Sequence, residues 1–313
     1  MPHIPVDTSA PLHPACVACL IKKQIDRYPA SASREDVLAY MRRLGDMMMT
    51  LTDLANGPEI MEAITDIRRE VFGEAAAEVE GDYAAIKRYF NRFMMDIAES
   101  EGIFHTIQDS SDPLRVALGY AMTGNFIDFG AMDAVDEDKL RALLTSAPDR
   151  IPADSPAYLS LEEKLATASS LTLLTDNCGE VVMDKLLVMT LRRLYPDLAV
   201  TVLFRGAPVL NDVTLEDARQ VGFDTLDGVT VVSNGDRLAG TALRRISPEA
   251  YAAVTEADLI ISKGQGNLET LQGCGLPIYY VFLCKCKLFA DRFGVPVYTG
   301  MLLREGDEGK DTP

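Results

Sequence analysis

Histidine is scarce in this chain: there are three among 313 residues, against 47 aspartates and glutamates and 30 lysines and arginines. So few imidazoles argue against a histidine-rich zinc enzyme, and any catalytic metal must rest mainly on oxygen ligands. The formal net charge of −17 argues against nucleic acid and anionic membrane surfaces as partners, because both need a basic footprint. An acidic protein binds a phosphorylated anion best where a metal ion or backbone N–H groups offset the repulsion.

Long apolar runs are also missing. No uninterrupted stretch approaches the roughly 20 residues that a membrane-spanning helix needs. The first residues, MPHIPVDTSAPLHPACVACL, have neither the basic segment nor the apolar core of a signal peptide. We therefore expect a cytoplasmic protein with no membrane partner, in which the six cysteines are thiols or metal ligands rather than disulfides.

The first part of the chain, residues 1–150, has a helical pattern. Apolar residues recur at intervals of three and four in REDVLAYMRRLGDMMMTLTDL, DYAAIKRYFNRFMMDIAES and DPLRVALGYAMTGNFIDFG. The methionines of this region favour core filling between helices over a flexible binding surface; they include Met41, Met47, Met48, Met49 and Met61. The proline-rich segment TSAPDRIPADSPAYLS breaks the pattern and predicts a domain boundary near residue 150.

Beyond residue 151, short apolar runs alternate with helical segments. The runs are LTLLT (171–175), AVTVLF (199–204), VTVVS (229–233), ADLIIS (257–262) and IYYVFL (278–283). Such alternation predicts a mostly parallel sheet covered on both faces. We therefore expect an α/β fold, in which residues 151–313 form an α/β/α sandwich with a Rossmann-like sheet. Residues 1–150 would form an all-helical region that lines the crevice.

Polar, glycine-containing loops follow four of these runs, where a parallel sheet places its ligand crevice. Asp176-Asn177 follows the first run, and Asp212 lies in the loop after the second. Carboxylate and carboxamide oxygens suit a hard cation such as Mg²⁺ or Mn²⁺. Lys263, after the fourth run, could hold a phosphate as a point charge. The pattern predicts metal-assisted phosphoester hydrolysis.

Each of these residues also has a purely structural interpretation. Asp176, Asn177 or Asp212 could cap the helix that follows it. Lys263 could be a solvated lysine, and Gly264 an ordinary turn glycine. The first-turn Glu180 favours the helix dipole over a direct role in the site. The convergence of four polar loops on one edge is what favours a functional site.

Together, the segments TGNFIDFG, TDNCGEVVMDKLL, RGAPVLNDVTLEDA and SKGQGNLETL resemble the DUF89 family of metal-dependent damage-control phosphatases. The similarity spans roughly residues 14 to 290, and the N-terminal CVACL is similar to the cysteine-containing microbial branch of that family. The resemblance implies a helical N-terminal region packed on an α/β/α sandwich. It also implies a divalent metal, such as manganese, magnesium, cobalt or nickel, and small phosphorylated metabolites as substrates.

The resemblance also assigns residues. Asp176, Asn177 and Asp212 would hold the metal. We expect Asp176 and Asp212 to be catalytic as well, with Asp176 as both ligand and catalytic group. Substrate would be bound by Lys263 and Gly264 and, through a Gly-Asn-x-x-Asp motif, by Asn125 and Asp128. Cys178 stands where family members commonly have alanine, which could add redox sensitivity.

The cysteines allow a second site. Cys16 and Cys19 form one close pair, and Cys284 and Cys286 form another. A structural zinc site of four thiolates would form if the N-terminus packed against the end of the last strand. The alternatives are two unrelated pairs of thiols, or a redox dithiol at Cys16 and Cys19.

Two other functions stay open. An S-adenosylmethionine-dependent methyltransferase would fit an alternating α/β domain, but it predicts a Gly-x-Gly loop after the first strand, where this chain has Asp-Asn-Cys-Gly. A non-enzymatic metal- or metabolite-binding protein would use the same crevice. The substrate, the physiological metal and the oligomeric state do not follow from the sequence.

Overall fold

A computed structural model describes residues 14–52, 55–76, 81–127 and 136–307. Asp128, assigned above to substrate binding, lies outside these ranges. The central feature is a six-stranded sheet with the strand order β3-β2-β1-β4-β5-β6. The strands are β1 (Ser170–Leu174), β2 (Ala199–Phe204), β3 (Val229–Ser233), β4 (Leu259–Lys263), β5 (Ile278–Leu283) and β6 (Gly300–Arg304).

Neighbouring strands from β3 to β5 run parallel, whereas β6 pairs antiparallel with β5. The five apolar runs therefore form the five parallel strands that the sequence predicts, and the expected α/β fold is confirmed. The antiparallel β6 was not predicted. The chain passes from β1 outward to β2 and β3 and then returns to β4 on the other side of β1. The switch point between β1 and β4 is where doubly wound sheets place their ligands.

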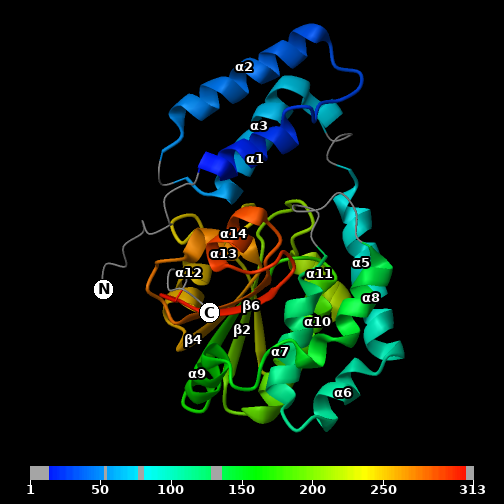
Figure 1. The fold of residues 1–313 in the computed structure, drawn as a ribbon, viewed down its shortest axis with the longest axis vertical. Helices are drawn as coiled ribbons and strands as arrows, with labels where there is room; N and C mark the ends of the chain where they lie inside the picture. Colours follow the sequence, from blue (N-terminus) through cyan, green and yellow to red (C-terminus); the bar gives the residue numbers. More distant parts are fainter. Residues whose placement is uncertain (1–13, 53–54, 77–80, 128–135, 308–313) are drawn as a thin grey trace.

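Helices cover both faces of the sheet, as Figure 1 shows. One face packs on α5 (Tyr83–Ser100), α7 (Pro113–Gly124), α9 (Pro156–Leu165), α10 (Glu180–Leu194) and α11 (Leu215–Val221), with α6 (Ile103–Asp109) and α8 (Glu137–Thr145) alongside. The other face packs on α12 (Pro248–Thr255), α13 (Gln265–Leu271) and α14 (Lys287–Phe293). Successive residues of β1 serve the two faces in turn: Leu171 and Leu173 belong to the first core, and Leu174 to the second.

The first three helices form a separate lobe, which we call the cap: α1 (Pro14–Gln24), α2 (Arg34–Thr50) and α3 (Gly57–Phe72). The cap has a small core of its own, with Tyr40, Leu44 and Ile64 at its centre. In Figure 1 it lies at one end of the molecule, above α13 and α14. Helices α5 to α8, by contrast, share the large core of the sheet. The domain boundary near residue 150 stays a prediction.

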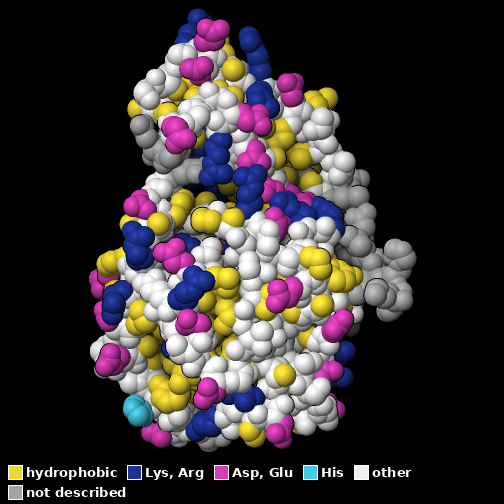
Figure 2. Space-filling model, turned by 180° about the vertical axis from the view of Figure 1, so that it is seen from behind, with side chains coloured by type: hydrophobic (Ala, Val, Ile, Leu, Met, Phe, Trp, Pro, Cys, Tyr) yellow, Lys and Arg dark blue, Asp and Glu magenta, His cyan; other side chains and the backbone are white. Residues whose placement is uncertain are grey.

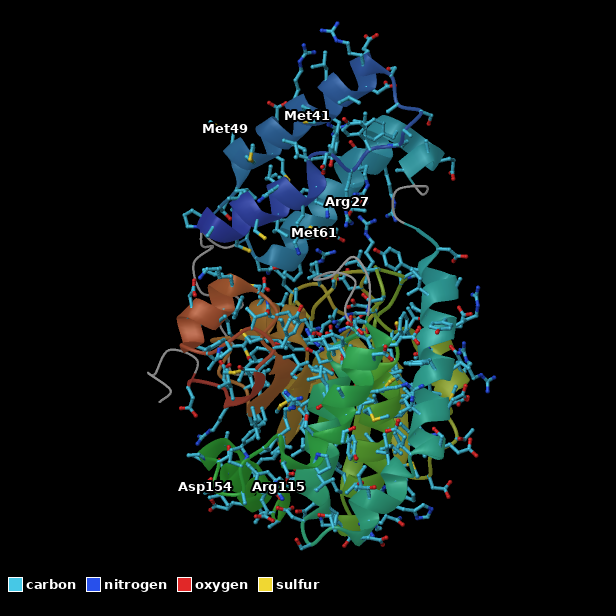
Figure 3. The ribbon with its side chains drawn as sticks, turned by 45° about the vertical axis from the view of Figure 1, so that its right-hand side comes forward. Arg27, Met41, Met49, Met61, Arg115 and Asp154 are labelled. Atoms are coloured by element: carbon cyan, nitrogen blue, oxygen red, sulfur yellow. The ribbon has the colours of Figure 1, made fainter. Side chains whose placement is uncertain are left out.

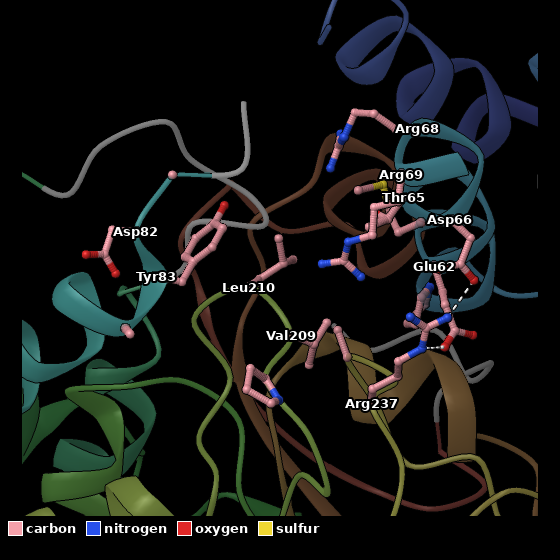
Figure 4. Close-up of a pocket in the computed structure, with 16 residues that line it drawn as sticks. Glu62, Thr65, Asp66, Arg68, Arg69, Asp82, Tyr83, Val209, Leu210 and Arg237 are labelled. Atoms are coloured by element: carbon pink, nitrogen blue, oxygen red, sulfur yellow. Dashed lines mark hydrogen bonds and ion pairs between the residues drawn. The ribbon is translucent and has the colours of Figure 1, made fainter. Parts of the chain in front are cut away.

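The expectation that the methionines fill the core is wrong for part of the set. Met49 is 87% exposed and Met48 is 41% exposed on α2, and Figure 3 shows Met49 at the end of that helix. Met47 packs against the core of the cap, whereas Met61 on α3 lines a cavity between the cap and residues 208–210 of the body, which Figure 4 shows. The 3.6-residue period predicts a helix, but a small lobe offers too few partners to cover every apolar side chain of a 17-residue helix.

Within the described ranges, no helix combines the length and the apolar character that crossing a lipid bilayer would require.

Candidate active site at the carboxyl ends of the strands

Backbone hydrogen bonds join the loops that follow β1 and β2. The Val213 N–H donates to the Asp176 carbonyl at 2.9 Å, and the Cys178 N–H donates to the Asn211 carbonyl at 2.9 Å. Asn177 and Asp212 thus face each other in a short antiparallel bridge. The two acidic loops are therefore fixed side by side at the edge where the sequence predicts a site.

One guanidinium group lies between the two carboxylates. Arg205, directly after β2, donates from Nε to Asp212 Oδ2 at 2.7 Å and from Nη2 to Asp176 Oδ1 at 3.5 Å. Its Nη1 donates to Asn267 Oδ1 at 3.1 Å and to Thr241 Oγ1 at 3.2 Å. All three charged side chains are buried. Two carboxylates against one guanidinium leave this group with one negative charge in excess.

Asn125 connects α7 to the same group. Its Nδ2 donates to Asp176 Oδ2 at 3.1 Å and to Glu180 Oε2 at 2.8 Å, and its Oδ1 accepts from the Leu283 N–H at 3.0 Å. Glu180 is fully buried and also accepts from the Asn177 backbone N–H at 3.3 Å. Glu180 lies in the first turn of α10, and its carboxylate also fixes the turn that carries Asp176 and Asn177.

Gly264 allows Asp176 to approach β4 closely. Gly264 has φ +78°, and a Cβ built on it would lie 1.9 Å from Asp176 Oδ2. Its N–H donates to the Val281 carbonyl at 3.2 Å. Gly264 therefore leaves room for the Asp176 carboxylate, and its N–H is used by a hydrogen bond to β5. Its predicted role in substrate binding stays a prediction.

Lys263 lies beneath the site in a buried ion cluster. Its ammonium donates to the Ala121 carbonyl at 2.9 Å, to Asp184 Oδ1 at 2.7 Å and to Glu180 Oε1. Lys263, Glu180 and Asp184 are all 0% exposed. An ammonium has three donors, and these three contacts use all of them. Direct binding of a phosphate by Lys263 stays a prediction, and it would require one of these contacts to be given up.

The cluster perturbs its own ionisation. Burial raises the pKa of Asp184 to about 7, although the charge of Lys263 opposes the rise. Burial by itself lowers the pKa of Lys263, but Asp184 and Glu180 together raise it above its ordinary value. Lys263 therefore stays a cation, and Asp184 is the neighbouring acid whose pKa is raised.

Several residues of the site were not identified from the sequence. Arg205 is a single arginine after a strand and reads as a solvated side chain. Lys87 on α5 donates to the Asp212 carbonyl at 3.0 Å and pairs with Asp217 at 2.6 Å. Asn267 donates to the carbonyls of Thr175 and Lys263. Their roles depend on contacts between distant segments. The sequence signal for Arg205 and Asn267 is their position in or near the polar loops, whereas Lys87 lies inside α5 and has no such signal.

The donor set at the edge fits a hard divalent cation. Asp176 and Asp212 supply carboxylate oxygens next to a carboxamide, and the excess negative charge of the group would be offset by a cation. The Asn177 carboxamide oxygen accepts from Asn211 Nδ2 at 2.9 Å. Its Nδ2 lies 2.5 Å from Asp176 Oδ2, so Asn177 must turn its amide to become a ligand. Among the described residues, no three His, Cys, Asp or Glu side chains gather as a metal-binding set.

The cysteines of the two close pairs lie within the described residues. Cys16, Cys19, Cys284 and Cys286 are free thiols. Cys16 lies close enough to Cys286 and Cys19 for their charges to interact, and the zinc site stays a prediction. Burial raises the pKa of Cys16 to about 12 and that of Cys284 to about 11. Cys178 is fully buried, and burial raises its pKa as well. Such a thiol is inert, so the suggested redox sensitivity has no structural support.

Comparison with known proteins identifies the family of this chain. The family model of the damage-control phosphatase ARMT1-like domain matches residues 12–301. The chain belongs to this family.

Relatives are found in archaea. An uncharacterized protein of Methanocaldococcus jannaschii is 27% identical over 301 residues, which cover 95% of this chain and 96% of that protein. A protein of Archaeoglobus fulgidus named damage-control phosphatase is 28% identical over 294 residues, or 91% of this chain and 96% of that protein. A crystal structure of a DUF89 family protein from Pyrococcus horikoshii superposes with a TM-score of 0.74, covering 94% of this chain and 99% of the other. At 24% identity, that superposition shows a common fold.

Proposed function

We propose that this protein is a metal-dependent phosphatase that hydrolyses small phosphorylated metabolites. The observation that supports this most directly is the meeting of Asp176 and Asp212 across Arg205 at the switch point of the sheet. The membership of this chain in the damage-control phosphatase family and the name of the Archaeoglobus fulgidus relative agree with this activity. Asp176 and Asp212 are only 6% and 4% exposed, and a buried site suits a small metabolite better than a macromolecule.

Asp176, Asn177 and Asp212 would hold the cation, which we expect to be Mn²⁺, Mg²⁺, Co²⁺ or Ni²⁺. When bound, such a cation polarises a phosphoryl oxygen and lowers the pKa of a water. Asp176 would also act as the catalytic group, because its carboxylate is the one that Asn125 and Gly264 fix in position.

The surrounding residues orient the two carboxylates. Arg205 holds Asp176 and Asp212 at a fixed separation, and its charge reduces their mutual repulsion. Lys87 fixes the Asp212 backbone from α5. Lys263 holds the Glu180 side chain in contact with the Asn177 turn. Arg205, Lys87, Lys263 and Glu180 are thus preorganised around the two carboxylates, and the rearrangement that metal binding requires is the turn of the Asn177 amide.

The test is hydrolysis of p-nitrophenyl phosphate by metal-stripped protein, with each of the four cations added back. We expect activity to return with at least one cation. D176N and D212N should stay at background, since each removes a charged ligand while keeping its shape. D291N is the matched control, because Asp291 is exposed and pairs with Lys287 on α14.

Two results would separate the alternatives. Wild-type activity that survives in both D176N and D212N would place the chemistry elsewhere. Tight cation binding that needs both aspartates, with no turnover of any phosphate ester, would instead identify a metal- or metabolite-binding protein.

A further inference from the structure

The three nitrogens of the Arg205 guanidinium are held unequally. Nε lies 2.7 Å from Asp212 Oδ2, whereas Nη2 lies 3.5 Å from Asp176 Oδ1. A separation of 3.5 Å is at the outer limit of a hydrogen bond. The third nitrogen, Nη1, donates to Asn267 Oδ1 at 3.1 Å and to Thr241 Oγ1 at 3.2 Å. Because the group is planar and rigid, it cannot turn closer to Asp176 without weakening the contacts of Nη1.

Thr241 is itself fixed in place. Its side chain is buried, and the residue is 1% exposed. The hydroxyl accepts from Arg205 and donates to Asn267 Oδ1 at 2.8 Å, while the Thr241 N–H donates to Thr270 Oγ1 at 2.9 Å. A hydroxyl that has both a donor and an acceptor partner keeps one orientation. The position of Thr241 therefore determines where Nη1 of Arg205 can lie.

Thr241 lies in the middle of a segment, residues 236–245, that the cap holds near both ends. On one side, Arg237 donates to Glu62 at 3.0 Å and to Asp66 at 2.5 Å, and Figure 4 draws both pairs as dashed lines. On the other side, Arg245 donates to the same Glu62 at 2.5 Å and 2.9 Å. Figure 2 shows basic and acidic side chains gathered where the two lobes meet. Glu62 of α3 thus joins the two ends of the segment across Thr241.

The same segment also contacts the backbone that follows Arg205. The Gly206 N–H donates to the Asp236 carbonyl at 2.7 Å, and a Cβ on Gly206 would lie 2.4 Å from the Asp236 nitrogen. Asp236 in turn pairs with Arg245 at 2.9 Å. A shift of the segment would therefore reach Arg205 through its backbone as well as through Thr241.

We propose that Thr241 holds Arg205 back from Asp176, and that the cap fixes Thr241 through Glu62. Without this restraint the guanidinium would turn toward Asp176 and compete with the cation for that carboxylate. The affinity of the site for its cation then depends on how the cap is docked on the body. Thr241 and Glu62 are positioning residues, because neither is a proposed ligand. This inference rests on the metal-dependent function proposed above.

Calorimetric titration of the metal-stripped protein with Mn²⁺ tests the role of Thr241. T241V keeps the shape of the side chain without its hydroxyl, and it should raise the Kd by about tenfold, the lower end of what a hydrogen bond to a charged group contributes. T241S restores the hydroxyl and should restore the wild-type Kd. T190V is the matched control and should bind as the wild type does, because Thr190 is also 1% exposed and donates to the Leu186 carbonyl inside α10.

A double-mutant cycle tests the link to the cap. E62Q keeps the shape of Glu62 and removes its charge, and it should raise the Kd by about threefold. Because both substitutions act through Arg205, E62Q/T241V should bind Mn²⁺ no more weakly than T241V alone. E70Q is the matched control: Glu70 lies on the same helix but pairs with Arg43 inside the cap, and its loss should leave the Kd unchanged.

The two steps of the proposal fail on different results. Equal Kd values for the wild type and T241V would overturn the role of Thr241 and leave the metal site standing, as would a T241S protein that binds as weakly as T241V. A double variant that binds about thirtyfold more weakly than the wild type would overturn the link to the cap, because independent effects add in free energy.

Nuclear magnetic resonance of the metal-stripped protein gives a result that needs neither cation nor turnover. The Nε–Hε resonance of Arg205, assigned by its absence in R205K, reports the contact with Asp212. T241V and E62Q should shift this resonance, and E70Q should not. An unshifted resonance in E62Q contradicts the link to the cap even if T241V does not fold. If the wild type binds no cation, the metal-dependent function fails by itself, and this resonance still decides the proposal.

Discussion

Gly264→Ala is the substitution whose effect the geometry defines most sharply. An alanine Cβ would lie 1.9 Å from Asp176 Oδ2 and 2.2 Å from Asp176 Cγ, closer than real Cβ atoms come to any atom. The backbone at φ +78° and ψ +161° is nearly restricted to glycine, and a side chain there costs about 1–3 kcal/mol. The clash adds to this cost by displacing the carboxylate from Arg205 and Asn125.

We expect G264A to fold with a free energy of unfolding lower by at least about 1–3 kcal/mol and to lose metal-dependent phosphatase activity. Urea unfolding measures the first effect, and p-nitrophenyl phosphate turnover across a metal titration measures the second. The matched control is G275A. Gly275 also has a positive φ, +74°, but a Cβ there meets nothing within 4 Å, so it reports the backbone cost alone.

The reasoning would be refuted by a G264A protein with wild-type activity and metal affinity. It would be refuted equally by G275A losing activity to the same extent, because the effect would then come from backbone strain rather than from Asp176.

Three further predictions concern the buried charges. R205Q should lower the free energy of unfolding by about 3–5 kcal/mol. Saturating Mn²⁺ should stabilise R205Q more than the wild type, because a cation replaces the lost charge. Equal stabilisation of both proteins in urea unfolding would count against a metal at Asp176 and Asp212. K263M leaves two carboxylates buried without their counter-charge and should lower the free energy of unfolding by about 3–5 kcal/mol. The double variant K263M/D184N should recover part of this loss. A K263M protein as stable as the wild type would contradict the ion cluster. The folded-state pKa of Asp184 is about 7, above its ordinary 3.8, so its contribution to stability is complete below about pH 4 and is lost as the pH rises through 7. D184N should lack that loss in unfolding curves at pH 4 to 8, and an unchanged pH profile would refute the raised pKa.

Much of the fold follows from local patterns in the sequence. Apolar runs such as Leu171–Thr175 alternate with amphipathic helices, and this pattern is sufficient to predict the five parallel strands and the edge where the site lies. The sixth strand, Gly300–Arg304, could not be predicted in this way, because a short edge strand carries no alternation with a helix. The separate core of the cap was also hidden, since periodicity shows that a face is apolar and not what it packs against.

The site was only partly predictable for a similar reason. Asp176, Asn177 and Asp212 could be identified because they follow strands, and the structure brings them together. Arg205 could not be identified, because its importance comes from pairing with both Asp176 and Asp212, which lie on two different loops. Lys263 was identified, but its three contacts inside the core depend on α7 and α10, and no local pattern reports them.

The cavity between the cap and the body, lined by Arg68, Arg69 and residues 208–210 among others, could not be predicted from the sequence either. Arg68 and Arg69 occupy successive positions of α3 and read as ordinary helix-surface residues. Their meeting with the loop 208–210 depends on how the cap is held on the body. That attachment includes ion pairs from Glu59, Glu62 and Asp66 to arginines of the segment 237–245, and such pairs between distant segments leave no pattern in the sequence.

The most direct measurement is a crystal structure of the protein soaked with Mn²⁺ and inorganic phosphate, with anomalous data collected at the manganese edge. The account predicts an anomalous peak in contact with carboxylate oxygens of Asp176 and Asp212 and with the turned amide of Asn177, and a phosphate beside it. A fully soaked crystal with no peak there, or with its strongest peak at Cys16 and Cys286, would contradict a metal-dependent site at this edge of the sheet.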